Sequence, residues 1–95
     1  NTTMNEEDKL KEEKLFTYLV NTFQSSAWIA LGKMKNPMTN KTEINLEQAS
    51  YYIDLLNMLQ VKTKNNLTQY EEQMLINIVS ELKMNFIQEK KKTDE

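Results

Sequence analysis

Two carboxylates on one predicted helix are the side chains best suited to chemistry in this chain. Glu47 and Asp54 lie seven residues apart, so a helix places them on the same face. Such a pair can bind a hard divalent cation or carry out acid–base chemistry. The helix dipole, however, accounts for Glu47 in the first turn, and solvent exposure or a bond to a neighbouring loop accounts for Asp54. We therefore predict no metal site and no catalytic residue.

A polar loop precedes this helix and could hold an anion where the backbone N–H groups of the helix start are free. Together, the loop and the carboxylate pair form the candidate ligand-binding set of Asn36, Thr39, Lys41, Thr42, Glu47 and Asp54. A shared site requires Lys41 or Thr42 to fold back over the carboxylates. The loop lacks the glycines of a phosphate loop, and Asn36 and Thr39 can instead hydrogen-bond their own backbone.

The composition excludes several kinds of site. The 95 residues include no His and no Cys, which removes the commonest general base, the commonest transition-metal ligand, thiolate sites and disulfides. Twelve basic residues against fourteen acidic ones give a net charge of -2, so we do not expect a nucleic-acid partner, which usually requires a basic patch. We predict a protein that is not an enzyme and that has no cofactor.

We expect helices to position these side chains. An all-β fold needs many turns, and one Gly and one Pro provide too few. The first helix is expected over about residues 6–31, and Gly32 ends it. Residues 15–31 carry no charge, but polar side chains interrupt them, so we expect no membrane span. The inward arc of this helix, about 160° wide, holds Leu15, Phe16, Leu19, Val20, Phe23, Ala27, Ala30 and Leu31.

Two further helices follow a long connection that contains the only proline. The second helix begins after the cap Asn45, with Gln48 as its capping-box partner, and ends near Thr63. The third begins with the capping box of Thr68 and Glu71 and continues to about residue 89. Apolar side chains cover about 240° of the second helix once Tyr51 and Met58 are included. They leave a narrow polar wedge of Glu47, Ser50, Asp54 and Asn57.

The chain divides into three segments. Residues 1–13 form a polar N-terminal segment with a partly frayed helix, residues 14–89 a single helical domain, and residues 90–95 a disordered charged tail. The run from Asn5 to Asp8 is acidic where a signal peptide would be basic, so we expect a cytoplasmic protein.

Large apolar side chains also lie outside the main arc of each helix. A three-helix monomer would expose them as a contiguous patch, which marks an interface. We therefore predict a homo-oligomer, with a dimer favoured. The alternative is that the helices cross steeply and bury these side chains within one chain. The predicted interface comprises Tyr18, Trp28, Ile29, Tyr52, Leu55, Leu59, Ile76 and Ile87.

Several segments carry a family resemblance. They are Asn-Pro-Met-Thr-Asn-Lys-Thr-Glu-Ile-Asn-Leu-Glu-Gln-Ala at residues 36–49, Ile-Asp-Leu-Leu-Asn-Met-Leu at residues 53–59, Lys-Thr-Lys at residues 62–64 and Asn-Leu-Thr at residues 66–68. These segments resemble the signature of a small bacterial family, domain of unknown function 1844, over about residues 14–87. One departure is Asn40, where members usually read Thr-Gly-Lys, although Asn also tolerates a left-handed turn. The resemblance implies a small, helical, cytosolic bacterial protein and supplies no activity.

The predicted fold is all-α, a three-helix fold built on a long helical hairpin and completed by homodimerisation. The predicted function is a non-enzymatic assembly or protein-interaction module that self-associates and can bind an unidentified protein partner. The alternative is a ligand- or nucleic-acid-binding module that uses the polar loop at residues 36–44 and the start of the second helix.

Overall fold

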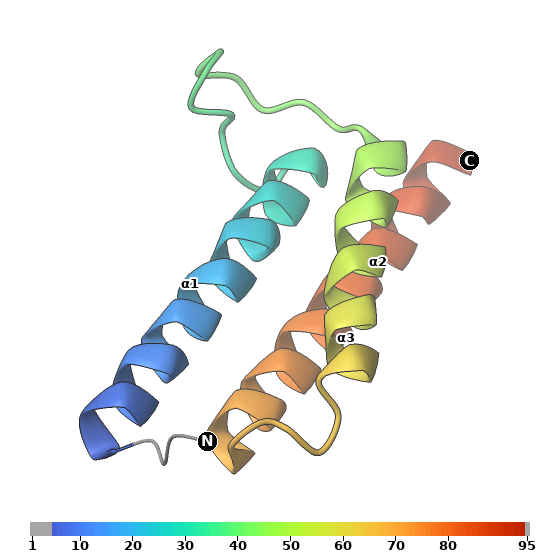
Figure 1. Ribbon diagram of the computed structural model, residues 1–95. Helices are drawn as coiled ribbons and strands as arrows, with labels where there is room; N and C mark the ends of the chain where they lie inside the picture. The colour runs from blue at the N-terminus through green and yellow to red at the C-terminus, as the bar shows by residue number, and fades with distance from the viewer. Residues whose placement is uncertain (1–4, 95) are drawn as a thin grey trace.

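The computed structural model describes residues 5–94 and contains three helices that run up, down and up (Figure 1). α1 spans Glu6–Ala30, α2 spans Leu46–Lys62 and α3 spans Gln69–Asp94. Over these described residues, the only extended pairing consists of two isolated bridges in the first connection. The prediction of an all-α three-helix fold is therefore confirmed, whereas its completion by a second chain stays a prediction.

α1 begins and ends close to the predicted residues because local signals fix both termini. The Asn5 side chain accepts a hydrogen bond from the backbone N–H of Asp8 at 2.8 Å. At the other end, the N–H of Lys33 bonds the carbonyl of Trp28, and Gly32 takes a φ of 76°. This is a Schellman ending, which requires a left-handed residue after the last turn. Of the predicted N-terminal segment, residues 1–4 lie outside the described part of the chain.

The first connection is a small hairpin rather than an open loop. Leu31 pairs with Ile44 at its base, and Asn36 pairs with Lys41 near its tip. The backbone N–H of Asn45 also donates to the carbonyl of Ala30 at 2.8 Å, so the end of α1 and the start of α2 are joined directly. Figure 1 shows this connection projecting beyond the ends of both helices. Its length, which is greater than a simple turn requires, therefore builds a structured arm.

α3 starts with the predicted capping box, whereas α2 starts with the predicted cap only, because the Asn45 N–H donates to the Ala30 carbonyl and not to the Gln48 side chain. The Asn45 side chain accepts a bond from the N–H of Gln48 at 3.1 Å. The box at α3 is reciprocal, because Thr68 Oγ1 accepts from the N–H of Glu71 at 3.1 Å and Glu71 Oε1 accepts from the N–H of Thr68 at 2.9 Å.

The C-terminal end of α3 differs from the prediction. We predicted a helix end near Glu89 and a disordered tail over residues 90–95, but α3 continues to Asp94, and residue 95 lies outside the described part. Contacts one turn apart support the extension. Lys90 pairs with Asp94 at 3.6 Å, and Lys92 Nζ donates to Glu89 at 3.1 Å. Lysine is also a good helix former, so a charged run need not end a helix.

The core is formed where α2 packs between α1 and α3, while α1 and α3 touch each other more sparingly. Its buried apolar residues are Val20, Ala27, Ala30, Leu31, Ala49, Ile53, Leu56, Leu75, Val79 and Leu82. One part of the predicted inward arc of α1 is wrong, because Leu15 and Leu19 are exposed. They lie at one edge of that arc, so the centre of the arc faces the core and this edge does not.

The molecule is long and thin, with extents of 55 × 27 × 18 Å. Its radius of gyration is 15.6 Å, whereas a compact chain of this length has about 12 Å. A thin structure of this kind leaves much of each helix in contact with solvent. None of the helices in the described part is long and apolar enough to cross a membrane.

Candidate functional site

The polar loop uses its own side chains to hold its shape. Asn36 Oδ1 accepts from the backbone N–H of Met38 at 2.8 Å, and Thr39 Oγ1 accepts from the N–H of Lys41 at 3.4 Å. The N–H of Asn40 donates to the carbonyl of Asn36 at 2.7 Å, with Asn40 in the left-handed region at φ 59°. Two of the predicted ligand-binding side chains, Asn36 and Thr39, are therefore part of the turn.

The predicted carboxylate pair lies in a shallow groove whose other wall is α3. Glu47 and Asp54 line this groove together with Phe86 and Lys90, and no described residue of the loop at 33–44 contributes to it. The structure therefore splits the candidate set in two. Asn36, Thr39, Lys41 and Thr42 lie in the arm, and the carboxylates lie on the side of α2 that borders α3.

No metal site emerges from this arrangement in residues 5–94, where no three carboxylates gather closely enough to hold an ion. Both Glu47 and Asp54 are exposed, and the groove that they line also contains the Lys90 ammonium. An exposed carboxylate pair beside a lysine suits contact with another charged surface better than it suits capture of a cation.

The predicted interface residues fall into two classes. Trp28, Tyr52 and Leu59 are partly buried against the core of their own chain, and the Phe23 and Tyr52 rings lie 6.4 Å apart across α1 and α2. Helix packing within one chain thus accounts for part of the off-arc apolar surface. The remaining predicted residues are exposed or half-buried outside that core, namely Tyr18, Ile29, Leu55, Ile76 and Ile87.

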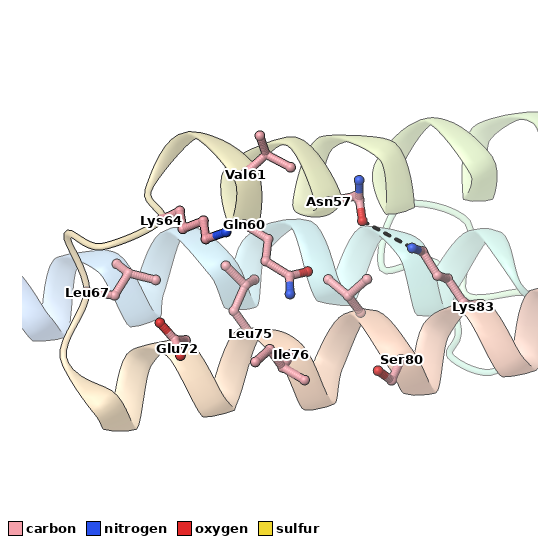
Figure 2. A pocket seen from close by; sticks show the side chains of 11 residues that line it. Asn57, Gln60, Val61, Lys64, Leu67, Glu72, Leu75, Ile76, Ser80 and Lys83 are labelled. Atoms are coloured by element: carbon pink, nitrogen blue, oxygen red, sulfur yellow. Dashed lines mark hydrogen bonds between the residues drawn. The ribbon is translucent and has the colours of Figure 1, made fainter.

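A second groove, more enclosed than the first, runs between the C-terminal half of α2 and the N-terminal half of α3 (Figure 2). Its volume is about 580 Å³. Asn57 of α2 and Lys83 of α3 close one end, where Lys83 Nζ donates to Asn57 Oδ1 at 3.1 Å. The side chains that line it are Asn57, Gln60, Val61, Lys64, Leu67, Glu72, Leu75, Ile76, Val79, Ser80 and Lys83. The groove has an apolar floor and charged edges, which is the usual composition of a protein-binding surface.

The two grooves belong to one surface, which we call the α2–α3 face. Along α2 its residues recur every three or four positions, as do those along α3, so each set forms one stripe. The face comprises Glu47, Ser50, Asp54, Asn57 and Val61 from α2, Lys64 from the turn that follows it, and Glu72, Ile76, Ser80, Lys83, Ile87 and Lys90 from α3. The polar wedge predicted on α2 is therefore one half of a two-helix surface.

A buried carboxylate lies on the opposite side of α3. Glu89 is only 4% exposed, and its Oε2 accepts from Lys33 Nζ at 2.9 Å and from Lys92 Nζ at 3.1 Å. The hydrogen bond from Lys33, followed by the one from Lys92, holds the pKa of the Glu89 carboxyl below its usual 4.5. Lys33 belongs to the first connection, so this cluster fastens the arm to α3.

Sequence reasoning missed the Lys33–Glu89 pair and the groove around Val61. The pair joins residues 56 positions apart, and no local pattern marks such a contact. The groove had a usable signal, because Val61 and Lys64 continue the three-and-four spacing of the stripe on α2, and residues from Glu72 to Lys90 repeat that spacing on α3. Only the antiparallel packing of the two helices shows that these stripes lie side by side.

Comparison with known proteins identifies a family. The family model described as "Domain of unknown function (DUF1844)" matches residues 13–88, which is most of the chain. The chain therefore belongs to this family, and the resemblance of its central segments is confirmed. No curated protein and no solved structure matches the chain.

Proposed function

We propose that this DUF1844 family member is a non-enzymatic helical module whose activity is self-association, in its simplest form as a two-fold dimer. Support comes from the balance between buried and exposed apolar side chains. Over residues 5–94 the core contains ten apolar residues, three of which are alanines, whereas thirteen large apolar residues are exposed. A chain of this size buries only a modest core, and contact with a second chain would bury part of the exposed apolar surface.

The exposed side chains are not scattered at random. α2 is the central helix, yet Tyr51 is 62% and Val61 is 66% exposed, and Met58 is also on its outer surface. On α1, Tyr18 and Leu19 are exposed as well. Single exposed apolar residues are ordinary, but repeated ones along the outer sides of adjacent helices are typical of surfaces that another protein covers.

Light scattering coupled to size exclusion tests the proposal directly. The chain mass is 11.3 kDa, and we expect at least twice that value over a wide range of protein concentration. Dissociation on dilution should follow mass action, because a dimer has a concentration-dependent population. A constant mass of one chain at the highest accessible concentration would show that the protein does not self-associate.

The loop-based alternative gains no comparable support from the geometry. The oxygens of Asn36 and Thr39 accept bonds within the turn, and the Lys33 ammonium donates to Glu89. Two of the predicted ligand oxygens and the Lys33 ammonium are therefore already engaged by groups of the same chain.

A further inference from the structure

We infer that the α2–α3 face is the surface through which two copies of this chain associate. The inference rests on the proposed self-association and adds the surface, its symmetry and the charges that select a second copy as the partner. Two features of the face carry it, namely an apolar strip along the groove and an alternating arrangement of charges around that strip.

The apolar strip is exposed where a partner would cover it. Val61 stands on the outer edge of α2, and Ile76 lines the groove from α3 (Figure 2). Ile87 follows Ile76 at helical spacing along α3 and is 56% exposed. Leu75 and Val79 form the floor beneath them. Covering this strip would remove apolar surface from water without disturbing the existing core.

The charges of the face alternate in sign between the two helices. On α2 the N-terminal half carries Glu47 and Asp54, and the turn just after its C-terminal end carries Lys64. On α3 the order along the chain is the same, with Glu72 near the start and lysines at positions 83 and 90. All six side chains are exposed, and three are acidic and three basic.

Antiparallel packing turns these two sequences into a four-cornered pattern. At one end of the face, acidic residues of α2 lie beside basic residues of α3, as Glu47 and Lys90 do in the shallow groove. At the other end, basic Lys64, in the turn after α2, lies beside acidic Glu72 of α3. Diagonal corners therefore have the same sign and adjacent corners have opposite signs.

This pattern complements itself under two-fold symmetry. A two-fold axis that runs along the helices places α2 over α3 of the second copy, so Glu47 meets Lys90 and Lys64 meets Glu72. An axis that runs across the helices places α2 over α2, so Glu47 and Asp54 meet Lys64. In both arrangements every corner faces the opposite sign. A uniformly acidic or basic partner would meet like charges at half of the corners, which costs affinity.

The existing contacts of these charges are weak enough to be exchanged. Lys90 pairs with Asp94 at 3.6 Å, with both side chains more than half exposed. Lys83 donates to the neutral Asn57 amide at 3.1 Å. Exposed pairs of this kind contribute little to stability, so an interface can replace them at small cost.

Charge reversal at the corners tests the inference. The first variant carries Glu47→Lys and Asp54→Lys, and the second carries Lys64→Glu and Lys90→Glu. Each alone brings like charges together in either two-fold arrangement, so its dimer should weaken by at least about tenfold. An equimolar mixture should recover part of the dimer. In the mixed dimer, positions 47 and 54 of the first variant face a reversed lysine position of the second, and only the contact at Glu72 of the first variant joins like charges, against two or four such contacts in the variants' own dimers. The readout is mass by light scattering, with circular dichroism to show that each variant keeps its helices.

Matched controls separate this effect from net charge. Glu7→Lys with Glu81→Lys, and Lys11→Glu with Lys14→Glu, change the net charge by the same amounts at exposed positions away from the face. Both controls should dimerise like the unchanged chain. If the face variants also dimerise like the unchanged chain, the interface lies elsewhere, with the exposed apolar side of α1 around Leu15 and Leu19 as the next candidate. If the unchanged chain is itself a monomer, self-association fails before the face is in question.

Discussion

The two connections that flank α2 hold this helix by different means. The first, residues 31–45, is an arm with two bridged pairs, and its base joins the last turn of α1 to the first turn of α2. The second, residues 63–68, is a short turn in which Asn65 takes a left-handed conformation at φ 68° and the α3 capping box begins. Both connections reverse the chain direction, but within residues 5–94 only the first forms a side-chain hydrogen bond to the helix that it does not adjoin, through Lys33 and Glu89.

This difference shows which parts of a helical fold depend on local residues and which depend on the assembled chain. Bonds within the second turn span three or four residues, so that turn can form as soon as α3 does. The base of the arm pairs Leu31 with Ile44, and its attachment to α3 needs all three helices in place. We therefore expect substitutions in the first connection to disturb the fold more than equivalent ones in the second.

The largest effect is expected for Gly32→Ala. Gly32 has a φ of 76°, and a Cβ atom added there would lie 2.7 Å from Ile44 Cγ1. The left-handed conformation costs an L-residue about 1–2 kcal/mol, and the Ile44 side chain must also move. Urea unfolding at fixed protein concentration should show this loss in the free energy of unfolding. An unchanged midpoint would mean that the arm can shift without loss, and that the two connections are equally tolerant.

Loss of the α3 cap should have a smaller effect. Thr68→Ala removes the hydroxyl that accepts from the N–H of Glu71 at 3.1 Å, and such a change costs about 1 kcal/mol. Thr68→Ser keeps an acceptor and should retain most of the stability. Urea unfolding of both variants gives the comparison. A greater loss for Thr68→Ala than for Gly32→Ala would reverse the proposed ranking of the two connections.

The attachment of the arm to α3 should depend on pH. Because Lys33 and Lys92 lower the pKa of Glu89 in the folded chain, this carboxylate adds stability above its unfolded pKa, and the contribution is lost as the pH falls through the lower folded pKa. Glu89→Gln removes the charge. The stability difference between the unchanged chain and this variant should be largest near neutral pH and shrink in acid. A difference that does not change with pH would mean that the carboxylate charge does not hold the arm.

The sequence predicted local features well. Gly32 after the first helix, Asn45 before the second and the Thr68–Glu71 box are all found, because each is formed by residues within a few positions of one another. The predicted end of α3 near Glu89 is wrong for a related reason. A run of charged residues suggested a tail, whereas the bonds that Lys92 and Thr93 make back to Glu89 keep the helix continuous.

Features formed by distant residues were not predicted. Leu15 and Trp28 illustrate this on α1, since periodicity placed Leu15 inside and Trp28 at an interface, while the structure exposes Leu15 and packs Trp28 against the core. The helical period shows which side chains share a face, but it does not show which neighbouring helix packs against each edge of that face. The same limit applies to the candidate site, because the two halves of the α2–α3 face come from stripes that only packing brings together.

The smallest effect is expected at the tip of the arm, and it sharpens the comparison within the first connection itself. Met38 is 90% exposed, so Met38→Ser should change the free energy of unfolding by less than about 0.5 kcal/mol. Asn40→Gly should be similarly mild, because glycine readily adopts the φ of 59° found there. Urea unfolding beside Gly32→Ala measures the contrast. If the tip variants lost as much stability as the base variant, the whole arm, and not its base alone, would have to be packed against the protein or a second copy.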